Sequence, residues 1–340
     1  MHMSDALLSP AVGGAMWAAA AAAVAHGARR MGREMDSRRI PLMGVLAAFV
    51  FAGQMINFTI PGTGSSGHLG GAVLLAVILG PCAALLAMAS ILTVQALFFA
   101  DGGLLALGCN IFNIGFVPAF IAYPLVFRPL AGNLPGPRRL MGASLAAGLA
   151  GLTLGALGVV LQTVLSGISE LRFLSFTAIM LPIHLVIGVV EGLITAAVVT
   201  FVWKARPEIL RSAAARRSPQ SRSLRRLVAA FAVAAAVTGG ALTWFASTKP
   251  DGLEWALRRA AGPEGVVSPG GGVHSTLEGV QKRTALLPDY HLQDGSLPGG
   301  SGADSSFSGI VGGSIALLLA LLVGYLSKRL TVAGKPGRGA

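Results

Sequence analysis

The chain contains many apolar stretches that are almost free of charge. A helix needs about 20 apolar residues to cross the roughly 30 Å hydrocarbon layer of a membrane. Only 12% of the 340 residues are charged, about half of the share in an average soluble domain. We therefore predict an all-α, polytopic membrane bundle. The predicted spans are residues 11–28, 41–58, 69–84, 86–100, 104–127, 142–166, 175–203, 227–246 and 309–327.

The third and fourth predicted spans form one irregular stretch. Residues 69–100 are too many for one ordinary span and few for two. Gly80 and Pro81 lie near the middle of this stretch. This pair predicts a turn or a kink.

Basic residues predict the orientation of the chain in the membrane. Most of the 26 Lys and Arg residues lie in segments 28–40, 128–139, 204–226 and 328–338. With nine spans, all four segments fall on one side, which the positive-inside rule makes cytoplasmic in a cell membrane. The N-terminus is then expected outside, uncleaved because its basic cluster follows the first apolar stretch, and the C-terminus inside. A net charge of +12 indicates nucleic acid in a soluble protein, but here it reports topology and we expect no nucleic acid partner.

The same pattern divides the chain into two blocks. Residues 1–205 are predicted to form a seven-span core, and residues 206–226 a basic cytoplasmic linker. Residues 227–340 are predicted to form a two-span hairpin around an external segment rich in Gly, Pro and polar residues. We expect that segment to be loosely ordered, or ordered only against the core.

Three groups on the external side could bind a metal ion. The Met1 amine, the His2 backbone nitrogen and His2 Nδ1 can close a five-membered and a six-membered chelate ring on one ion. Square-planar nitrogen ligation of this kind suits Ni(II) or Cu(II). His68 lies in a glycine-containing loop on the same face and could supply the fourth nitrogen. The alternative is a histidine in a mobile terminus and a solvated loop histidine.

Other polar residues have weaker claims to a function. His184 and Glu191 lie two helical turns apart in the seventh span and either line a path or make an internal contact. Asn110, Asn113 and Gln95 favour interhelical hydrogen bonds over a substrate role. The external His274 and His291 could pass metal inward, but solvated surface positions are favoured.

Motifs of several enzyme classes are missing from the sequence. It has no GxxxxGK[ST] phosphate loop, so we expect no ATP bound in that manner. It also lacks HExxH and a GxSxG motif at a strand-to-helix turn. We therefore expect that the chain is not an enzyme, although a membrane metalloenzyme or a metal sensor stays open as an alternative.

Several motifs resemble those of one family. The start, MHMSDALLSP, the stretch GHLGG at 67–71 with ILGP at 78–81, and QALFFADGG at 95–103 with ALGCNIFN at 106–113 carry the likeness. Together they resemble the CbiM/NikM substrate-capture subunits of energy-coupling-factor transporters for cobalt and nickel, over residues 1–205. The motifs KPDGLE at 249–254 and LPDY at 287–290 resemble the two-span N subunit, or PDGLE domain, of the same systems, here fused to the core.

The resemblance implies a function and a set of ligands. The metal would be captured outside by the Met1 amine, the His2 amide and imidazole, and His68. The partners would be a transmembrane coupling subunit and two cytoplasmic ATPases, which would supply the ATP hydrolysis. The transported substrate would be Ni²⁺, as in the nickel branch of the family, or alternatively Co²⁺ for cobalamin synthesis.

Overall fold

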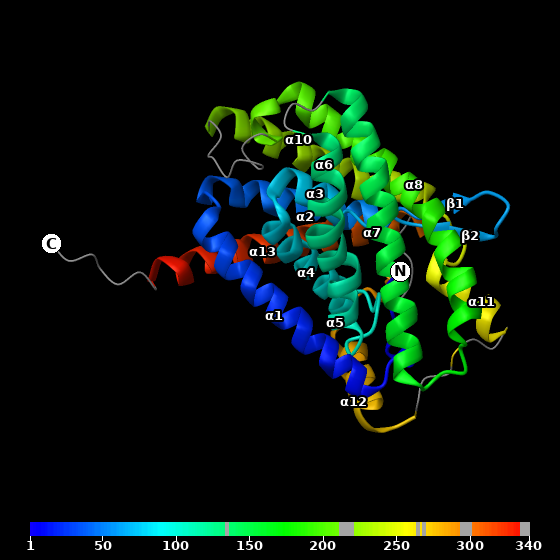
Figure 1. Ribbon diagram of the computed structural model, residues 1–340. Coiled ribbons are helices and arrows are strands. Elements are labelled where there is room, and N and C mark those ends of the chain that lie inside the picture. Colours follow the sequence, from blue (N-terminus) through cyan, green and yellow to red (C-terminus); the bar gives the residue numbers. More distant parts are fainter. Residues whose placement is uncertain (133–135, 211–220, 263–265, 267–269, 293–300, 334–340) are drawn as a thin grey trace.

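The protein is a bundle of long helices (Figure 1). The computed structural model describes residues 1–132, 136–210, 221–262, 266, 270–292 and 301–333. Six helices in these ranges are long and apolar enough to cross a membrane. They are α1 (Pro10–Glu34), α4 (Pro81–Phe98), the continuous helix of α5 (Leu107–Asn110), η3 (Ile111–Phe127) and α6 (Arg128–Ala131), α7 (Pro137–Ser166), α8 (Phe173–Ala205) and α13 (Ser301–Ala333).

The remaining predicted spans correspond to helices outside this group of six. They are α2 (Ile40–Gln54), α3 (Ala72–Leu79) and α10 (Ser221–Gly240). The prediction of a helix over 69–84 is wrong, because α3 has only 8 residues, about 12 Å of helix. The chain breaks at Gly80, which has a φ of +89°, and α4 begins at Pro81. This confirms the turn predicted at Gly80 and Pro81.

α3 and α4 carry the chain from the end of α2 back to its start and out again. The Gly70 carbonyl, just before α3, accepts a hydrogen bond from Gln54 at the end of α2. The Ile78 carbonyl, near the end of α3, accepts one from Arg39 at the start of α2. Gln95, near the end of α4, donates to Gln54 again. The turn at Gly80 thus lies near Arg30, Arg33, Arg39 and Arg128, at what we call the arginine-rich end of the bundle.

Small residues let the helices of the core approach closely. α7 packs along α8 and along η3. A Cβ atom on Gly192 of α8 would lie 2.6 Å from the Leu145 Cα of α7, and one on Gly148 would lie 2.7 Å from the Gly192 nitrogen. Close backbone approach of this kind is how helices associate where lipid provides no hydrophobic drive.

The outer faces of the long helices are apolar. Large exposed apolar patches are uncommon on soluble monomers, so an apolar belt indicates contact with lipid. The exposed side chains on α7, α8 and α13 include Leu154, Leu161, Leu165, Leu174, Leu185, Val189, Leu193, Phe201, Leu318 and Leu322.

The second block packs on the first. α10 and α13 both contact α2. Between them lie η4 (Leu242–Phe245), α11 (Gly252–Ala261), α12 (Gly272–Thr284) and η5 (Pro288–Tyr290). α11 packs on α8, and α12 on α4. The described part of the segment predicted to be external is thus ordered against the core, one of the two states predicted for it. Much of the predicted linker, residues 211–220, lies outside the described residues.

A small hairpin completes the contact between the blocks. β1 (Phe58–Ile60) pairs antiparallel with β2 (Ser65–Gly67), with Phe58 opposite Gly67. The Ser66 amide of β2 donates to the Pro250 carbonyl of the second block. This bond brings the start of α11 next to the loop that carries His68.

Candidate metal centre

The N-terminal segment is fixed to the loop after α4. The Met3 amide donates to Asn110 Oδ1 (2.8 Å), and Asn110 Nδ2 donates back to the Met3 carbonyl (3.2 Å). Asp5 Oδ1 accepts from the Ala106 amide (2.9 Å). A Cβ atom on Gly103 would lie 1.8 Å from Asp5 Oδ1, so only glycine fits there. These contacts direct the first two residues into the protein.

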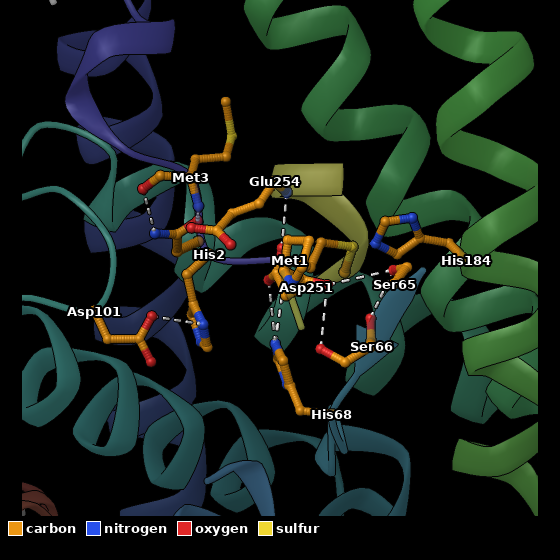
Figure 2. A network of polar contacts seen from close by, with 12 residues as sticks. Met1, His2, Met3, Ser65, Ser66, His68, Asp101, His184, Asp251 and Glu254 are labelled. Atoms are coloured by element: carbon orange, nitrogen blue, oxygen red, sulfur yellow. Dashed lines mark hydrogen bonds and ion pairs between the residues drawn. The ribbon is translucent and has the colours of Figure 1, made fainter. Parts of the chain in front are cut away.

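Met1, His2 and His68 come together in the interior (Figure 2). The Met1 amine lies 3.0 Å from His68 Nε2. The rings of His2 and His68 are stacked, with centroids 5.0 Å apart and planes 5° from parallel. The alternative of a mobile terminus and a solvated loop histidine is therefore not what the structure shows.

His68 presents a lone pair to the amine. Its Nδ1 lies 3.1 Å from the Leu69 carbonyl, which can only accept, so Nδ1 carries the proton and Nε2 is free to bind. Burial lowers the pKa of His68, and the neighbouring Met1 ammonium lowers it further. A neutral imidazole is the form that binds metal.

Glu191 holds the loop that carries His68. Its two carboxylate oxygens accept from the amides of Gly70 (2.7 Å) and Gly71 (2.9 Å). Gly71 has a φ of +82°, a conformation that glycine adopts at little cost. Of the two roles predicted for Glu191, the structure thus places it in an internal contact, one that positions a candidate ligand.

His184 lies beside the same group of residues. Its Nδ1 is bonded to the Met180 carbonyl (2.8 Å), and its buried Nε2 has no partner among the described residues. His184 lines a cavity of about 10 Å³ together with Met1, His68 and Gly252. Figure 2 shows His184 next to Met1, on the side away from His2.

Asp251 of the second block binds the amine. Its Oδ2 lies 2.7 Å from the Met1 nitrogen and 3.8 Å from His68 Nε2. Its Oδ1 accepts from the Glu254 amide (2.8 Å) and caps the N-terminus of α11. Burial would raise the pKa of Asp251, but the Met1 ammonium and His68 together hold it well below its usual value. Asp251 is therefore a carboxylate close to two of the three candidate ligand residues, Met1 and His68.

Asp101 holds His2 in a similar way. Its Oδ1 lies 3.1 Å from His2 Nδ1, and its Oδ2 accepts from the Tyr290 hydroxyl. Burial would raise the pKa of Asp101, but His2 and the bond from Tyr290 hold it below its usual value. Burial and the Asp101 charge raise the pKa of Tyr290 well above normal, so Tyr290 remains a donor.

Sequence reasoning missed both aspartates. Asp251 stands before Gly252 and an apolar residue, a usual helix start. This pattern predicts that Asp251 caps α11, but it does not predict the contact between Asp251 and the Met1 amine. Asp101 stands in a motif used above only for its likeness to a family.

A cavity of about 650 Å³ leads to these residues from the surface between the two blocks. Its charged lining is mostly acidic, which favours a cation. The acidic residues are Asp5, Asp101, Asp251, Glu254, Glu278 and Asp289, with Lys249 the cation among the lining residues.

The other predicted polar residues have structural contacts. Gln95 and Asn113 make interhelical hydrogen bonds, to Gln54 and Gln162 respectively, as predicted. The prediction that His274 is solvated is wrong, because His274 of α12 is buried and its Nε2 donates to the Leu8 carbonyl (2.9 Å). His291 is half exposed and lies 3.9 Å from Asp304.

Comparison with known proteins gives relatives that align with about 62–64% of this chain. A protein of Haloquadratum walsbyi, provisionally described as a metal transport protein, is 39% identical over 62% of this chain and 93% of its own length. The fused nickel transport protein NikMN of Rhodobacter capsulatus is 32% identical over 64% of this chain and 65% of its own. A crystal structure of a transition metal transporter has 30% identity and a TM-score of 0.54, covering 62% of this chain and 97% of that one.

Two family profiles match the sequence. The PDGLE domain matches residues 225–329. The profile of the cobalt uptake substrate-specific transmembrane region, CbiM, matches residues 2–209, so the chain belongs to the CbiM family and carries a PDGLE domain behind its CbiM region.

Proposed function

We propose that this protein captures Ni²⁺ at the external face of the cell membrane and passes it inward as the substrate-binding subunit of an ATP-driven transporter. The observation that carries the proposal is the convergence of Met1, His2 and His68 at the end of an acidic cavity. Membership of the CbiM family and the named nickel and cobalt relatives support it.

The distance between two of the proposed ligands fits a square plane. In a chelate of the Met1 amine, the His2 amide and His2 Nδ1, the amide lies in the middle, so the fourth position is next to the amine. Neighbouring nitrogens at about 2.0 Å from a metal are about 2.8 Å apart in a plane. The Met1 nitrogen and His68 Nε2 are 3.0 Å apart, and they could bind one ion with little movement.

His2 requires a rearrangement before it binds. Its Nδ1 faces Asp101, whereas chelation needs Nδ1 to point at the same ion as the Met1 amine and the His2 amide. A rotation of the imidazole about the Cβ–Cγ bond would bring Nδ1 to the other edge of the ring. His2 Nε2 is buried without a partner among the described residues, so the present orientation leaves one ring nitrogen unsatisfied.

The ligand set favours nickel over cobalt. A deprotonated amide with an amine and two imidazoles forms a square-planar nitrogen site, which suits Ni(II). The described residues hold no group of three or more His, Cys, Asp or Glu side chains arranged for a metal, so the proposed site depends on main-chain and terminal nitrogen. Cobalt is the second candidate, because a cobalt transport protein of Geobacter sulfurreducens is 34% identical over 62% of this chain.

Transport would need partners that couple it to ATP. We propose a transmembrane coupling subunit and two cytoplasmic ATPase subunits. The surface of α1 supports the first of these, since its apolar window is only 17% buried and its middle is a run of alanines. Small side chains allow close packing of a second helix in the membrane.

The proposed orientation places the metal centre outside. Arg29, Arg30 and Arg33 lie at the end of α1 opposite to Met1, and Arg128 lies in α6 at the same end. By the positive-inside rule that end is cytoplasmic. Met1, His2 and His68 would then face the external space through the acidic cavity.

Isothermal titration of the purified full chain with Ni²⁺ tests the proposal. Adding one residue before Met1, or making His2→Ala, should abolish high-affinity binding while the protein still inserts and melts cooperatively. Intact mass measurement would establish that the amine of Met1 is free in the control protein. Retained nickel affinity in both variants would exclude the proposed ligands, and tighter binding of Co²⁺ than Ni²⁺ by the control protein would favour cobalt.

A further inference from the structure

A second cavity lies at the arginine-rich end of the bundle, opposite to the metal centre. Its volume is about 470 Å³, and it lies among α1, the start of α2, the turn between α3 and α4, and the end of η3. The charged part of its lining is mainly basic, with Glu34 and Asp36 as its acidic members. The basic residues that line it are Arg30, Arg33, Arg39, Arg128 and Lys328.

Arg39 is a buried cation in this cavity. Its side chain is only 5% exposed. Nη2 donates to the Ile78 carbonyl (2.9 Å), and Nε is buried without an acceptor among the described residues. Burial lowers the pKa of Arg39, and Asp36 only partly offsets this effect. A buried guanidinium with an unused donor calls for an anionic acceptor.

The first turn of α4 is a second, independent source of positive charge at this cavity. α4 begins at Pro81, and Pro81, Cys82 and Ala83 line the cavity. Its N-cap residue is Gly80, and no side chain among the residues that the structure describes caps the helix. The N-terminus of a helix of 18 residues carries a partial positive charge and attracts anions such as phosphate.

The remaining wall is apolar and aromatic. It includes Met31, Phe120, Tyr123 and Pro124. A free inorganic ion makes no favourable contact with such a surface, whereas a phospholipid presents a phosphate next to apolar chains. Basic pockets between membrane helices on the cytoplasmic side bind anionic headgroups.

We propose that this cavity binds the phosphate of an anionic phospholipid from the cytoplasmic leaflet, with Arg39 and the start of α4 as its centre. The site is separate from the metal centre and does not depend on which metal the protein carries. The choice of leaflet rests on the proposed orientation, with the arginine-rich end at the cytoplasmic surface of the membrane.

Thermal melting of the purified full chain in neutral detergent tests the proposal. Phosphatidylglycerol should raise the melting temperature of the unmodified protein in a saturable manner, and phosphatidylcholine should not. Arg39→Gln should weaken the apparent affinity for phosphatidylglycerol about tenfold, the effect expected for one charged hydrogen bond. Arg38→Gln is the matched control, because Arg38 is exposed and is not among the cavity-lining residues, and it should change little.

Two further measurements keep the outcome clear. If Arg39→Gln does not fold, Arg128→Gln removes another lining cation, from an exposed position, and should weaken phosphatidylglycerol binding. Inorganic phosphate at the same concentration should not reproduce the stabilisation; if it does, the ligand is a free phosphate and not a lipid. Equal effects of the two lipids on the unmodified protein, or equal losses in Arg38→Gln and Arg39→Gln, would overturn the proposal. Nickel binding should be unchanged in every variant.

Discussion

Asp251→Asn isolates one of the two roles of this carboxylate. Oδ1 caps α11 through the Glu254 amide, and Oδ2 binds the Met1 nitrogen. Asparagine is as good an N-cap as aspartate, so its carbonyl oxygen can keep the bond to Glu254. Its amide group then replaces Oδ2 and presents donors to an amine that needs an acceptor. The variant should therefore retain α11 and lose only the contact with the proposed ligand.

The size of the effect follows from the type of bond. A metal-bound amine still carries N–H groups, so Asp251 can hold it in place after the ion has bound. Hydrogen bonds to a charged partner contribute about 1.5–3 kcal/mol, a factor of roughly 10–150 in affinity. Removing a residue that orients a metal ligand typically costs 10- to 100-fold. Since the Asp251 side chain is 19% exposed, we expect the lower part of this range, about tenfold.

Isothermal titration with Ni²⁺ measures this loss, and the visible absorption of the bound ion reports whether the ligand geometry has changed. Asp289→Asn is the matched control: Asp289 lines the same acidic cavity, and asparagine tolerates its φ of +49°. It removes the same charge without contacting the amine and should change affinity by less than threefold. An Asp251→Asn affinity equal to that of the control would refute the positioning role, while nickel binding that survives His2→Ala would instead refute the site as a whole.

Further predictions concern the other residues of the centre. His68→Ala should weaken Ni²⁺ binding less than His2→Ala, because it removes one donor and no chelate ring; titration of both variants compares them. Glu191→Gln should lower nickel affinity about tenfold, since one of the two amide bonds that hold the loop of Gly70 and Gly71 is lost, and unchanged affinity would mean that the loop needs no such support. The folded state lowers the pKa of His68, so the unfolded chain binds more protons and the metal-free protein should lose stability as the pH falls below about 6.5. Melting temperatures at neutral and mildly acidic pH should show a smaller decrease in His68→Gln than in the unmodified protein.

Composition was sufficient to predict the long helices. α1, α4, α7, α8 and α13 each contain an apolar window that only a membrane or a large core can cover, and this signal needs no knowledge of tertiary contacts. The 69–84 stretch was predicted as a helix for the same reason. There the Gly70 and Gly71 amides donate to the carboxylate of Glu191. These two residues therefore lie outside α3, although the apolar stretch around them predicts a helix.

The metal centre was predictable only in part. The charge pattern could predict that His2 and His68 lie on one side of the membrane, and the structure stacks their rings. Asp251 escaped prediction because no local pattern links it to Met1. The Asp251 carboxylate of the second block reaches the amine from 250 residues away in the sequence. The contact depends on α11 packing against α8, which is a property of the folded bundle.

The bond between Met1 and Asp251 also imposes an order on biosynthesis. The two partners are 250 residues apart, so the first atom of the chain meets its carboxylate only when three quarters of the chain has been made. At 5–20 residues per second, Met1 waits about 12–50 s during translation. Any group that initiation leaves on its nitrogen must be removed in that interval, before the second block closes over it. A molecule whose Met1 nitrogen is still blocked at that point lacks the charged amine that Asp251 binds.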